Sequence, residues 1–212
     1  MTPDPILKIC GMTRVSDALH AVREGATAIG FVFWKGSPRY VEPDVAGEIA
    51  AALPSTVTTV GVFVDESVEG IRETVRMAGV RMVQLHGEEP VSYADRLGQP
   101  VMRAVTLDNA IAIEQTWPKG TTLLLDSTDP ARQGSGRAVV DWARAMDIAR
   151  DRRVVLAGGL TPDNVAEAIM TVRPIGVDVS SGVESAPGVK DLDKVARFVA
   201  NARAAFVRVV TT

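Results

Sequence analysis

Several features are scarce in this 212-residue chain, and each scarcity excludes a class of protein. The chain has one cysteine, Cys10, so an internal disulfide cannot form and a disulfide scaffold is excluded. The chain also lacks a large excess of either charge: 23 basic and 26 acidic side chains give a formal net charge of −3, and no block of like charge occurs. We therefore expect neither nucleic acid nor an anionic membrane as a partner.

Long hydrophobic runs are absent as well. The N-terminal "MTPDPILK" has no basic region leading into a long apolar stretch, and no later segment approaches the length that spans a bilayer. A cytoplasmic protein is expected. What the chain does have is a globular composition, 46% hydrophobic and 23% charged, which suits one domain over residues 1–212 with a sizeable core.

Short runs rich in Val, Ile and Phe alternate with longer amphipathic stretches along the whole chain. The runs predict eight strands, over residues 6–10, 28–33, 58–64, 81–86, 100–105, 122–126, 153–157 and 176–180. Most are followed by a helical pattern with a recognisable end, such as the one that stops at Gly25. The pattern is weak over 88–98, and 107–117 is expected to be largely loop.

Eight repeats of strand then helix predict an α/β fold, a (β/α)8 TIM barrel with little insertion. An open doubly wound sheet is the structural alternative. That fold usually has a glycine-rich phosphate fingerprint directly after its first strand, and "CGMTR" does not supply one. A barrel places its active site at the carboxyl ends of the strands, so the residues that close the strands are the ones to inspect.

Polar side chains close several of the predicted strands on the inward-facing parity. They are Lys8 with Cys10, Gln84 with His86, Asp178 with Ser180, and Asp126 at the end of the sixth strand. An unpaired polar group inside a core costs about 1–3 kcal/mol, so this set predicts a site for a polar ligand. Two structural alternatives stay open: Lys8 could form an internal ion pair with an aspartate, and His86 could be a hydrogen-bonded core histidine.

Two glycine-bearing turns predict a phosphate site. "LAGGLTPDNV" follows the seventh strand and offers Thr161 as a helix N-cap, and "DVSSGVES" follows the eighth, where a short extra helix could open. Backbone N–H groups at helix starts bind anions, and barrels of this kind often hold phosphate in these two loops. The expected phosphate-binding residues are Gly158, Gly159, Ser180, Ser181 and Gly182. A phosphorylated small molecule is the expected substrate.

Taken together, the strand ends carry the motifs of a known family. In chain order they read "KICGMT", "GFVFWKGSPRYV", "VGVFVD", "VQLHGEE", "LLLDS", "GGLTPDNV" and "GVDVSSGVES" followed by "GVKD". Over its whole length the chain resembles phosphoribosylanthranilate isomerase, the (β/α)8 enzyme of tryptophan biosynthesis. The sixth loop, "RQGSGRAVVDW", departs from the family pattern at Gln133 and Val140. We interpret its stretch from Gln133 to Arg137 as a lid.

The resemblance implies an Amadori rearrangement of N-(5-phosphoribosyl)anthranilate, with no cofactor and no metal. It assigns the base that removes the C2′ proton to Cys10, and the acid that protonates the ribose ring oxygen to Asp126. It also implies that Arg39 holds the anthranilate carboxylate and that Asp178 contacts the sugar hydroxyls. Gln84 is expected to bind the substrate beside them.

These roles make demands on the two catalytic groups. A thiol titrates near about 8.5 and needs a cationic neighbour to ionise at neutral pH, and Lys8 on the same strand is a candidate. Service of Asp126 as an acid implies a pKa raised by burial or by a nearby negative charge, part of which Asp178 could supply.

Three other functions stay open. A metal-dependent sugar phosphate epimerase would need several histidine and carboxylate ligands, whereas the chain has only His20, in the first helical pattern, and His86. An isomerase for the histidine-pathway aminoaldose shares the same reaction step, but such enzymes use two aspartates and a substrate with two phosphates, and here the first strand ends in Cys10. A non-catalytic phosphate-binding barrel is the third. The resembled family includes monomers and homodimers, and the sequence does not decide between them.

Overall fold

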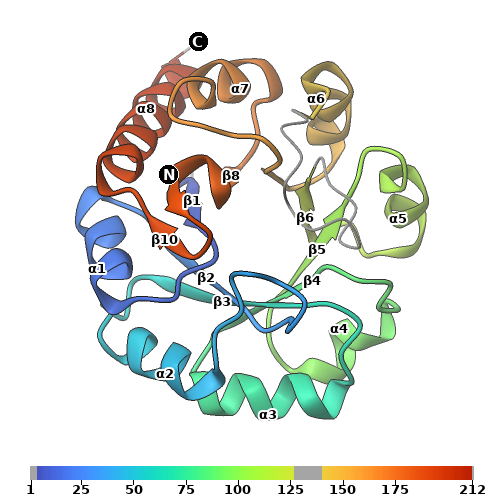
Figure 1. Ribbon diagram of the computed structural model, residues 1–212. Coiled ribbons are helices and arrows are strands. Elements are labelled where there is room, and N and C mark those ends of the chain that lie inside the picture. Colours follow the sequence, from blue (N-terminus) through green and yellow to red (C-terminus); the bar gives the residue numbers. More distant parts are fainter. Residues whose placement is uncertain (1–3, 127–139, 212) are drawn as a thin grey trace.

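The computed structural model describes residues 4–126 and 140–211. Eight parallel strands form a closed barrel in which each strand pairs with the next and β8 pairs with β1 (Figure 1). The strands are β1 Ile6–Ile9, β2 Ala28–Val32, β3 Thr58–Phe63, β4 Met82–Leu85, β5 Val101–Val105, β6 Thr122–Leu125, β7 Val154–Leu156 and β8 Gly176–Val179. The predicted (β/α)8 TIM barrel is confirmed, and each predicted strand is present but one or two residues shorter.

Helices surround the barrel and alternate with its strands (Figure 1). They are α1 Val15–Glu24, α2 Pro43–Ala51, α3 Val68–Ala78, α4 Ser92–Leu97, α5 Ala110–Thr116, α6 Trp142–Asp151, α7 Val165–Val172 and α8 Leu192–Thr211. The helix α1 ends at Gly25, as predicted, where φ is 109°. Between α7 and α1, helix α8 completes the ring, and its buried Ala205 and Phe206 dock the C-terminal segment. Within the described residues, no helix combines the length and apolar character needed to cross a membrane.

Two elements differ from the sequence prediction. The expected loop at 107–117 contains the helix α5. Its 7 residues span about two turns, too few to show a helical period in the sequence, and the buried Ala110 and Trp117 pack its two ends against the core. A short hairpin, β9 Glu184–Ala186 with β10 Val189–Lys190, was missed altogether.

Strand alternation creates two separate apolar layers. Leu7 and Ile9 of β1 point outward and pack in the large cluster between the strands and the helices. Inside the barrel lies a smaller cluster of Met102, Ala104, Leu124, Val155 and Ala157. These side chains come from β5, β6 and β7, so the barrel interior beside β8, β1 and β4 is left to other residues, including the polar ones described next.

Candidate active site

A buried ion pair lies at the centre of the carboxyl end of the barrel. The β1–β8 register places Lys8 opposite Asp178, and Lys8 Nζ donates to Asp178 Oδ1 at 3.0 Å. Lys8 is 0% exposed and Asp178 is 8% exposed. The ion pair that the sequence left open for Lys8 is therefore present, and the same ammonium group also faces the Cys10 sulfur.

Cys10 follows β1, and its backbone N–H donates to the Val179 carbonyl at 2.8 Å. Burial raises the pKa of the Cys10 thiol, while Lys8 lowers it by a smaller amount and Asp178 raises it further. Lys8 is thus the cationic neighbour that the sequence indicated, but burial outweighs it. Cys10 is therefore a neutral thiol at pH 7. Burial disfavours its thiolate form, and the adjacent ammonium group of Lys8 offsets part of that effect.

Gly30 of β2 makes the room that these two side chains occupy. A Cβ atom at Gly30 would lie 2.8 Å from Cys10 Sγ and 3.0 Å from Lys8 Nζ. Even the smallest side chain would therefore displace the thiol or the ammonium group. Gly30 was not among the predicted site residues, although a glycine inside the predicted strand 28–33 is a signal for close approach of another group.

A second group of polar side chains lies across the same end of the barrel. Asp126 follows β6, held by a 2.9 Å hydrogen bond from its backbone N–H to the Val105 carbonyl, and its Oδ2 lies 3.9 Å from His86 Nε2. Gln84 Nε2 lies 3.1 Å from His86 Nδ1. An amide nitrogen can only donate, so Nδ1 accepts and the ring proton sits on Nε2, which faces Asp126.

His86 is therefore part of this polar group rather than a histidine of the apolar core. Burial lowers the pKa of His86, an effect that exceeds the opposing influence of Asp126, so the imidazole is neutral at pH 7. As a neutral donor it can hydrogen-bond a carboxylate or a ligand oxygen without adding charge to the site.

Two buried polar atoms at this end have no hydrogen-bond partner within the part of the chain that the structure describes. They are Gln84 Oε1 and Ser180 Oγ. Leaving such an atom unpaired costs about 1–3 kcal/mol, and a polar ligand in the barrel would remove the cost. Both residues come from the set that the sequence selected, and the structure brings them to the same end of the barrel.

The two predicted phosphate turns pack directly against each other. Gly158 and Gly159 have φ values of 72° and 68°, the left-handed region that favours glycine. A Cβ atom at Gly182 would overlap the Leu160 carbonyl oxygen, so this glycine lets the second turn contact the first. Ser181–Val183 forms the predicted short helix, with Ser180 before it.

Thr161 makes the hydrogen bonds of a capping residue, as predicted, but α7 begins later than predicted. The helix begins at Val165, and Thr161 opens a turn before it. The Thr161 hydroxyl accepts from the Asp163 N–H at 3.3 Å, and Asn164 Oδ1 accepts from the Thr161 N–H at 2.8 Å. These side-chain bonds stabilise a turn in place of the first helical residues.

Arg39 lies at the rim, beside Gly11 and Ser180. A Cβ atom at Gly11 would lie 2.7 Å from Arg39 Cδ and 3.0 Å from Ser180 Oγ, and the φ of Gly11 is 73°. The Arg39 guanidinium is paired with Glu184, and Glu184 is also paired with Lys190. Neither Glu184 nor Lys190 was a predicted site residue, although they lie in the motifs "GVES" and "GVKD".

The proposed lid from Gln133 to Arg137 lies outside the described residues. Val140, the other departure from the family pattern, is buried in the outer apolar layer. Among residues 4–126 and 140–211, no group of three or more His, Cys, Asp or Glu side chains is arranged to hold a metal ion.

The fold and the site define the class: a (β/α)8 barrel enzyme with a thiol, a carboxyl group and an imidazole grouped at the carboxyl end of its strands. Residues 7–201 match the family model described as N-(5′-phosphoribosyl)anthranilate isomerase. The chain is also 46% identical over 201 residues to the protein of that name from Trichlorobacter lovleyi, covering 94% of this chain and 98% of the relative.

Solved structures agree with this assignment. Monomers of the dimeric phosphoribosylanthranilate isomerase from Thermotoga maritima match with a TM-score of 0.81 at 39% identity, covering 93% of this chain and 98% of the other. A phosphoribosylanthranilate isomerase in complex with reduced 1-(o-carboxyphenylamino)-1-deoxyribulose 5-phosphate matches with a TM-score of 0.82 at 40% identity and the same coverage. The chain belongs to the N-(5′-phosphoribosyl)anthranilate isomerase family.

Proposed function

We propose that this protein isomerises N-(5-phosphoribosyl)anthranilate to 1-(2-carboxyphenylamino)-1-deoxyribulose 5-phosphate, the aldose-to-ketose step of tryptophan biosynthesis. Family membership supplies the reaction. The observation of this structure that carries the proposal is the grouping of one thiol and one carboxyl group, Cys10 and Asp126, around an end of the barrel with unpaired buried polar atoms.

The reaction needs one acid and one base. Asp126 is assigned as the acid that gives a proton to the ribose ring oxygen, which breaks the C1′–O bond and leaves a protonated Schiff base. Cys10, as the thiolate, then takes the C2′ proton, and the electron pair of that bond forms an enolamine. Transfer of a proton to C1′ and loss of the hydroxyl proton at C2′ gives the aminoketose, so the conversion is an isomerisation with no net oxidation.

Lys8 has a defined part in this scheme. Its ammonium group faces the Cys10 sulfur, so it stabilises the thiolate when that form appears. Lys8 also holds Asp178 through Oδ1. We assign the second carboxylate oxygen of Asp178 to a sugar hydroxyl, and Gln84 Oε1 to another polar group of the substrate.

The remaining contacts fix the two ends of the substrate. We assign the phosphate to the paired turns, with Gly158, Gly159, Ser180, Ser181 and Gly182 supplying backbone N–H groups and Ser180 its unpaired hydroxyl. Arg39 takes the anthranilate carboxylate. We further propose a cytoplasmic location, and a monomer or homodimer as the working form.

The direct test follows the loss of anthranilate-type fluorescence when purified protein meets freshly generated substrate. Rapid loss supports the proposal, and the histidine-pathway aminoaldose is assayed in parallel. Turnover of that second compound alone would assign a different substrate to the same chemistry. Binding of the substrate without turnover would make the chain a non-catalytic phosphate-binding barrel.

A further inference from the structure

The Arg39–Glu184 pair joins two segments that are 145 residues apart in the chain. Arg39 Nε donates to Glu184 Oε1 at 2.9 Å, and Arg39 Nη2 donates to Glu184 Oε2 at 2.8 Å. Two parallel hydrogen bonds of this kind fix the plane of the guanidinium as well as its position. The pair is well shielded, since the Arg39 side chain is 14% exposed and the Glu184 side chain is 5% exposed.

Glu184 is itself held in place by the β9–β10 hairpin. Lys190 Nζ donates to Glu184 Oε1 at 2.8 Å, to the Cys10 carbonyl at 2.6 Å and to the Ser180 carbonyl at 3.4 Å. The Gly188 N–H adds a bond to Glu184 Oε1 at 3.3 Å. The hairpin therefore ties the carboxylate of Glu184 to the backbone of the proposed base and of a phosphate turn.

This arrangement leaves one edge of Arg39 for a ligand. A guanidinium has two edges that can each take a carboxylate, and Glu184 occupies the one formed by Nε and Nη2. Within the residues that the structure describes, Nη1 has no hydrogen-bond partner. The edge formed by Nη1 and Nη2 is thus the one presented to a second carboxylate.

The charges of the group favour a singly charged ligand. Arg39 and Lys190 carry one positive charge each and Glu184 one negative charge, so the three together carry one net positive charge. A carboxylate neutralises this charge, whereas a phosphate dianion would leave an excess negative charge in a partly buried place.

We propose that Glu184 is a positioning residue for substrate specificity: it orients Arg39 so that its free edge recognises the anthranilate carboxylate. This inference rests on the proposed function, and it adds a residue that acts through Arg39 rather than on the reacting atoms. A carboxylate that competed with the substrate for Arg39 would have the opposite role. The two roles predict opposite effects.

Binding of two probes separates the roles without requiring turnover. One probe is reduced 1-(2-carboxyphenylamino)-1-deoxyribulose 5-phosphate, and the other is the same compound made from aniline, which lacks the carboxylate. The ratio of their Kd values, measured by calorimetry, isolates the contribution of the carboxylate. In the wild type we expect a ratio of about 10 to 100, as for a charge-assisted bidentate contact.

In Glu184→Gln we expect the ratio to fall by about tenfold, with the Kd of the aniline-derived probe changed by less than about threefold. Arg39→Lys should lower the ratio similarly, since a lysine cannot present a planar edge. Glu184→Asp keeps the charge but shortens the reach of the carboxylate, so it should also lower the ratio. It replaces Glu184→Gln as the test variant if Glu184→Gln folds poorly. The matched control is Glu89→Gln in the loop after β4, near His86 but without a contact to Arg39, which breaks a buried glutamate–arginine pair with Arg103 and should leave the ratio unchanged.

The other outcomes overturn the inference. An unchanged ratio in a folded Glu184→Gln variant, or equal weakening of both probes, would make the pair purely structural. Tighter binding of the carboxylated probe would make Glu184 a competitor of the substrate. A wild type that binds neither probe would instead refute the substrate assignment, so the failure of the proposed function is distinguishable.

Discussion

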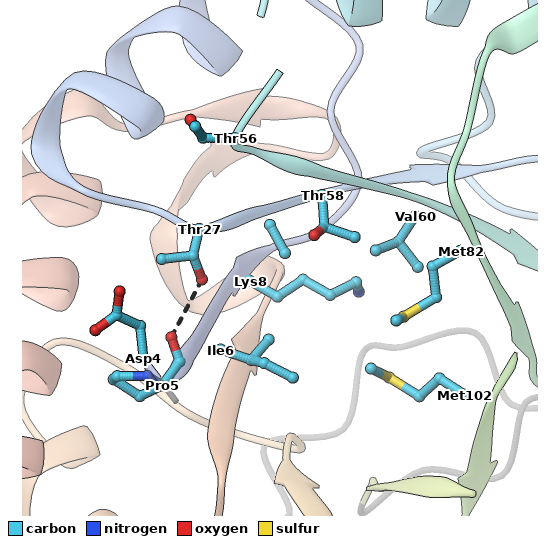
Figure 2. Close-up of a pocket in the computed structure, with 11 residues that line it drawn as sticks. Asp4, Pro5, Ile6, Lys8, Thr27, Thr56, Thr58, Val60, Met82 and Met102 are labelled. Carbon is cyan, nitrogen blue, oxygen red and sulfur yellow. Dashed lines mark hydrogen bonds between the residues drawn. The ribbon is translucent and has the colours of Figure 1, made fainter. Parts of the chain in front are cut away.

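The two ends of the barrel interior are built from the same strands but have different side chains. The carboxyl end holds a thiol, an ion pair, a carboxyl group and two unpaired polar atoms. The amino end holds a cavity of about 230 Å³ whose walls are mostly aliphatic and threonine side chains (Figure 2). Its inward-facing strand residues include Ile6, Thr58, Val60, Met82 and Met102. Asp4 and Lys8 are the charged residues that line this cavity (Figure 2), and the groups that we assign to catalysis lie at the other end.

Lys8 belongs to both ends. Figure 2 shows its side chain running along the amino-end cavity, whose wall it forms, while its ammonium group bonds to Asp178. The alkyl chain of a lysine packs against apolar groups while its head is paired. The Lys8 side chain therefore lies between the part of the barrel that we assign to catalysis and the amino-end cavity.

The largest effects are expected from removing the acid or the base. Cys10→Ala and Asp126→Asn should each lower kcat/KM by about 10²-fold to 10⁴-fold, because each removes one proton-transfer group. The fluorescence assay measures this, with circular dichroism as the control for folding. A fully active Cys10→Ala variant would show that Cys10 is a small buried side chain with a packing role only.

The next effect concerns stability at the boundary between the two ends. Lys8→Met leaves the Asp178 carboxylate buried without its partner and should lower the free energy of unfolding by about 3–5 kcal/mol. Adding Asp178→Asn removes that charge, so the double variant should lose clearly less than the sum of the single variants. Urea unfolding measures all three, and simple additivity would show that the two groups do not interact.

Gly30→Ala tests the space around the thiol. The added methyl group would lie 2.8 Å from Cys10 Sγ, so we expect kcat/KM to fall by about 10- to 100-fold, with a stability cost of about 1–3 kcal/mol. Gly120→Ala is the matched control, because a Cβ there meets nothing within 4 Å. Equal activities of the two variants would mean that the thiol position is not critical.

The smallest effects are expected for Gln84 and Met82 of β4. Both side chains face the barrel interior, Gln84 at its carboxyl end and Met82 at its amino end. Gln84→Leu should lower kcat/KM by about tenfold through loss of a polar contact. Met82→Leu, at the amino end, should keep kcat/KM within about twofold and change the free energy of unfolding by less than about 1.5 kcal/mol. If Met82→Leu impairs turnover as much as Gln84→Leu, the separation between the two ends is wrong.

Several residues at the carboxyl end could be predicted from the sequence, because the direction of a strand side chain depends only on its position in the strand. Apolar runs located the eight strands, and their period of two placed Lys8 and Cys10 on the same side. Closure of a barrel then puts the last strand beside the first, which is why Lys8 meets Asp178. Each of these steps depends on neighbours in sequence or on the fold class.

The residues that were missed depend on contacts that no local pattern specifies. Glu184 and Lys190 sit on a hairpin too short to give a strand signal, and their partners come from distant segments. Likewise, the role of Gly30 depends on side chains of the neighbouring strand. The late start of α7 was missed because Thr161 and Asn164 form side-chain bonds that stabilise a turn.

The central claim is that Cys10, at the carboxyl end, is the base, and the pH dependence of kcat/KM tests it most directly. Burial raises the pKa of this thiol, and a base acts only when deprotonated. In the Asp126→Asn variant, where the acid no longer titrates, the residual kcat/KM should rise about tenfold per pH unit from neutral pH and level off above the ordinary thiol value of about 8.5. The thiolate absorbance, corrected with Cys10→Ala, should rise with the same midpoint. A flat profile through this range, or a midpoint unrelated to the absorbance, would contradict the account.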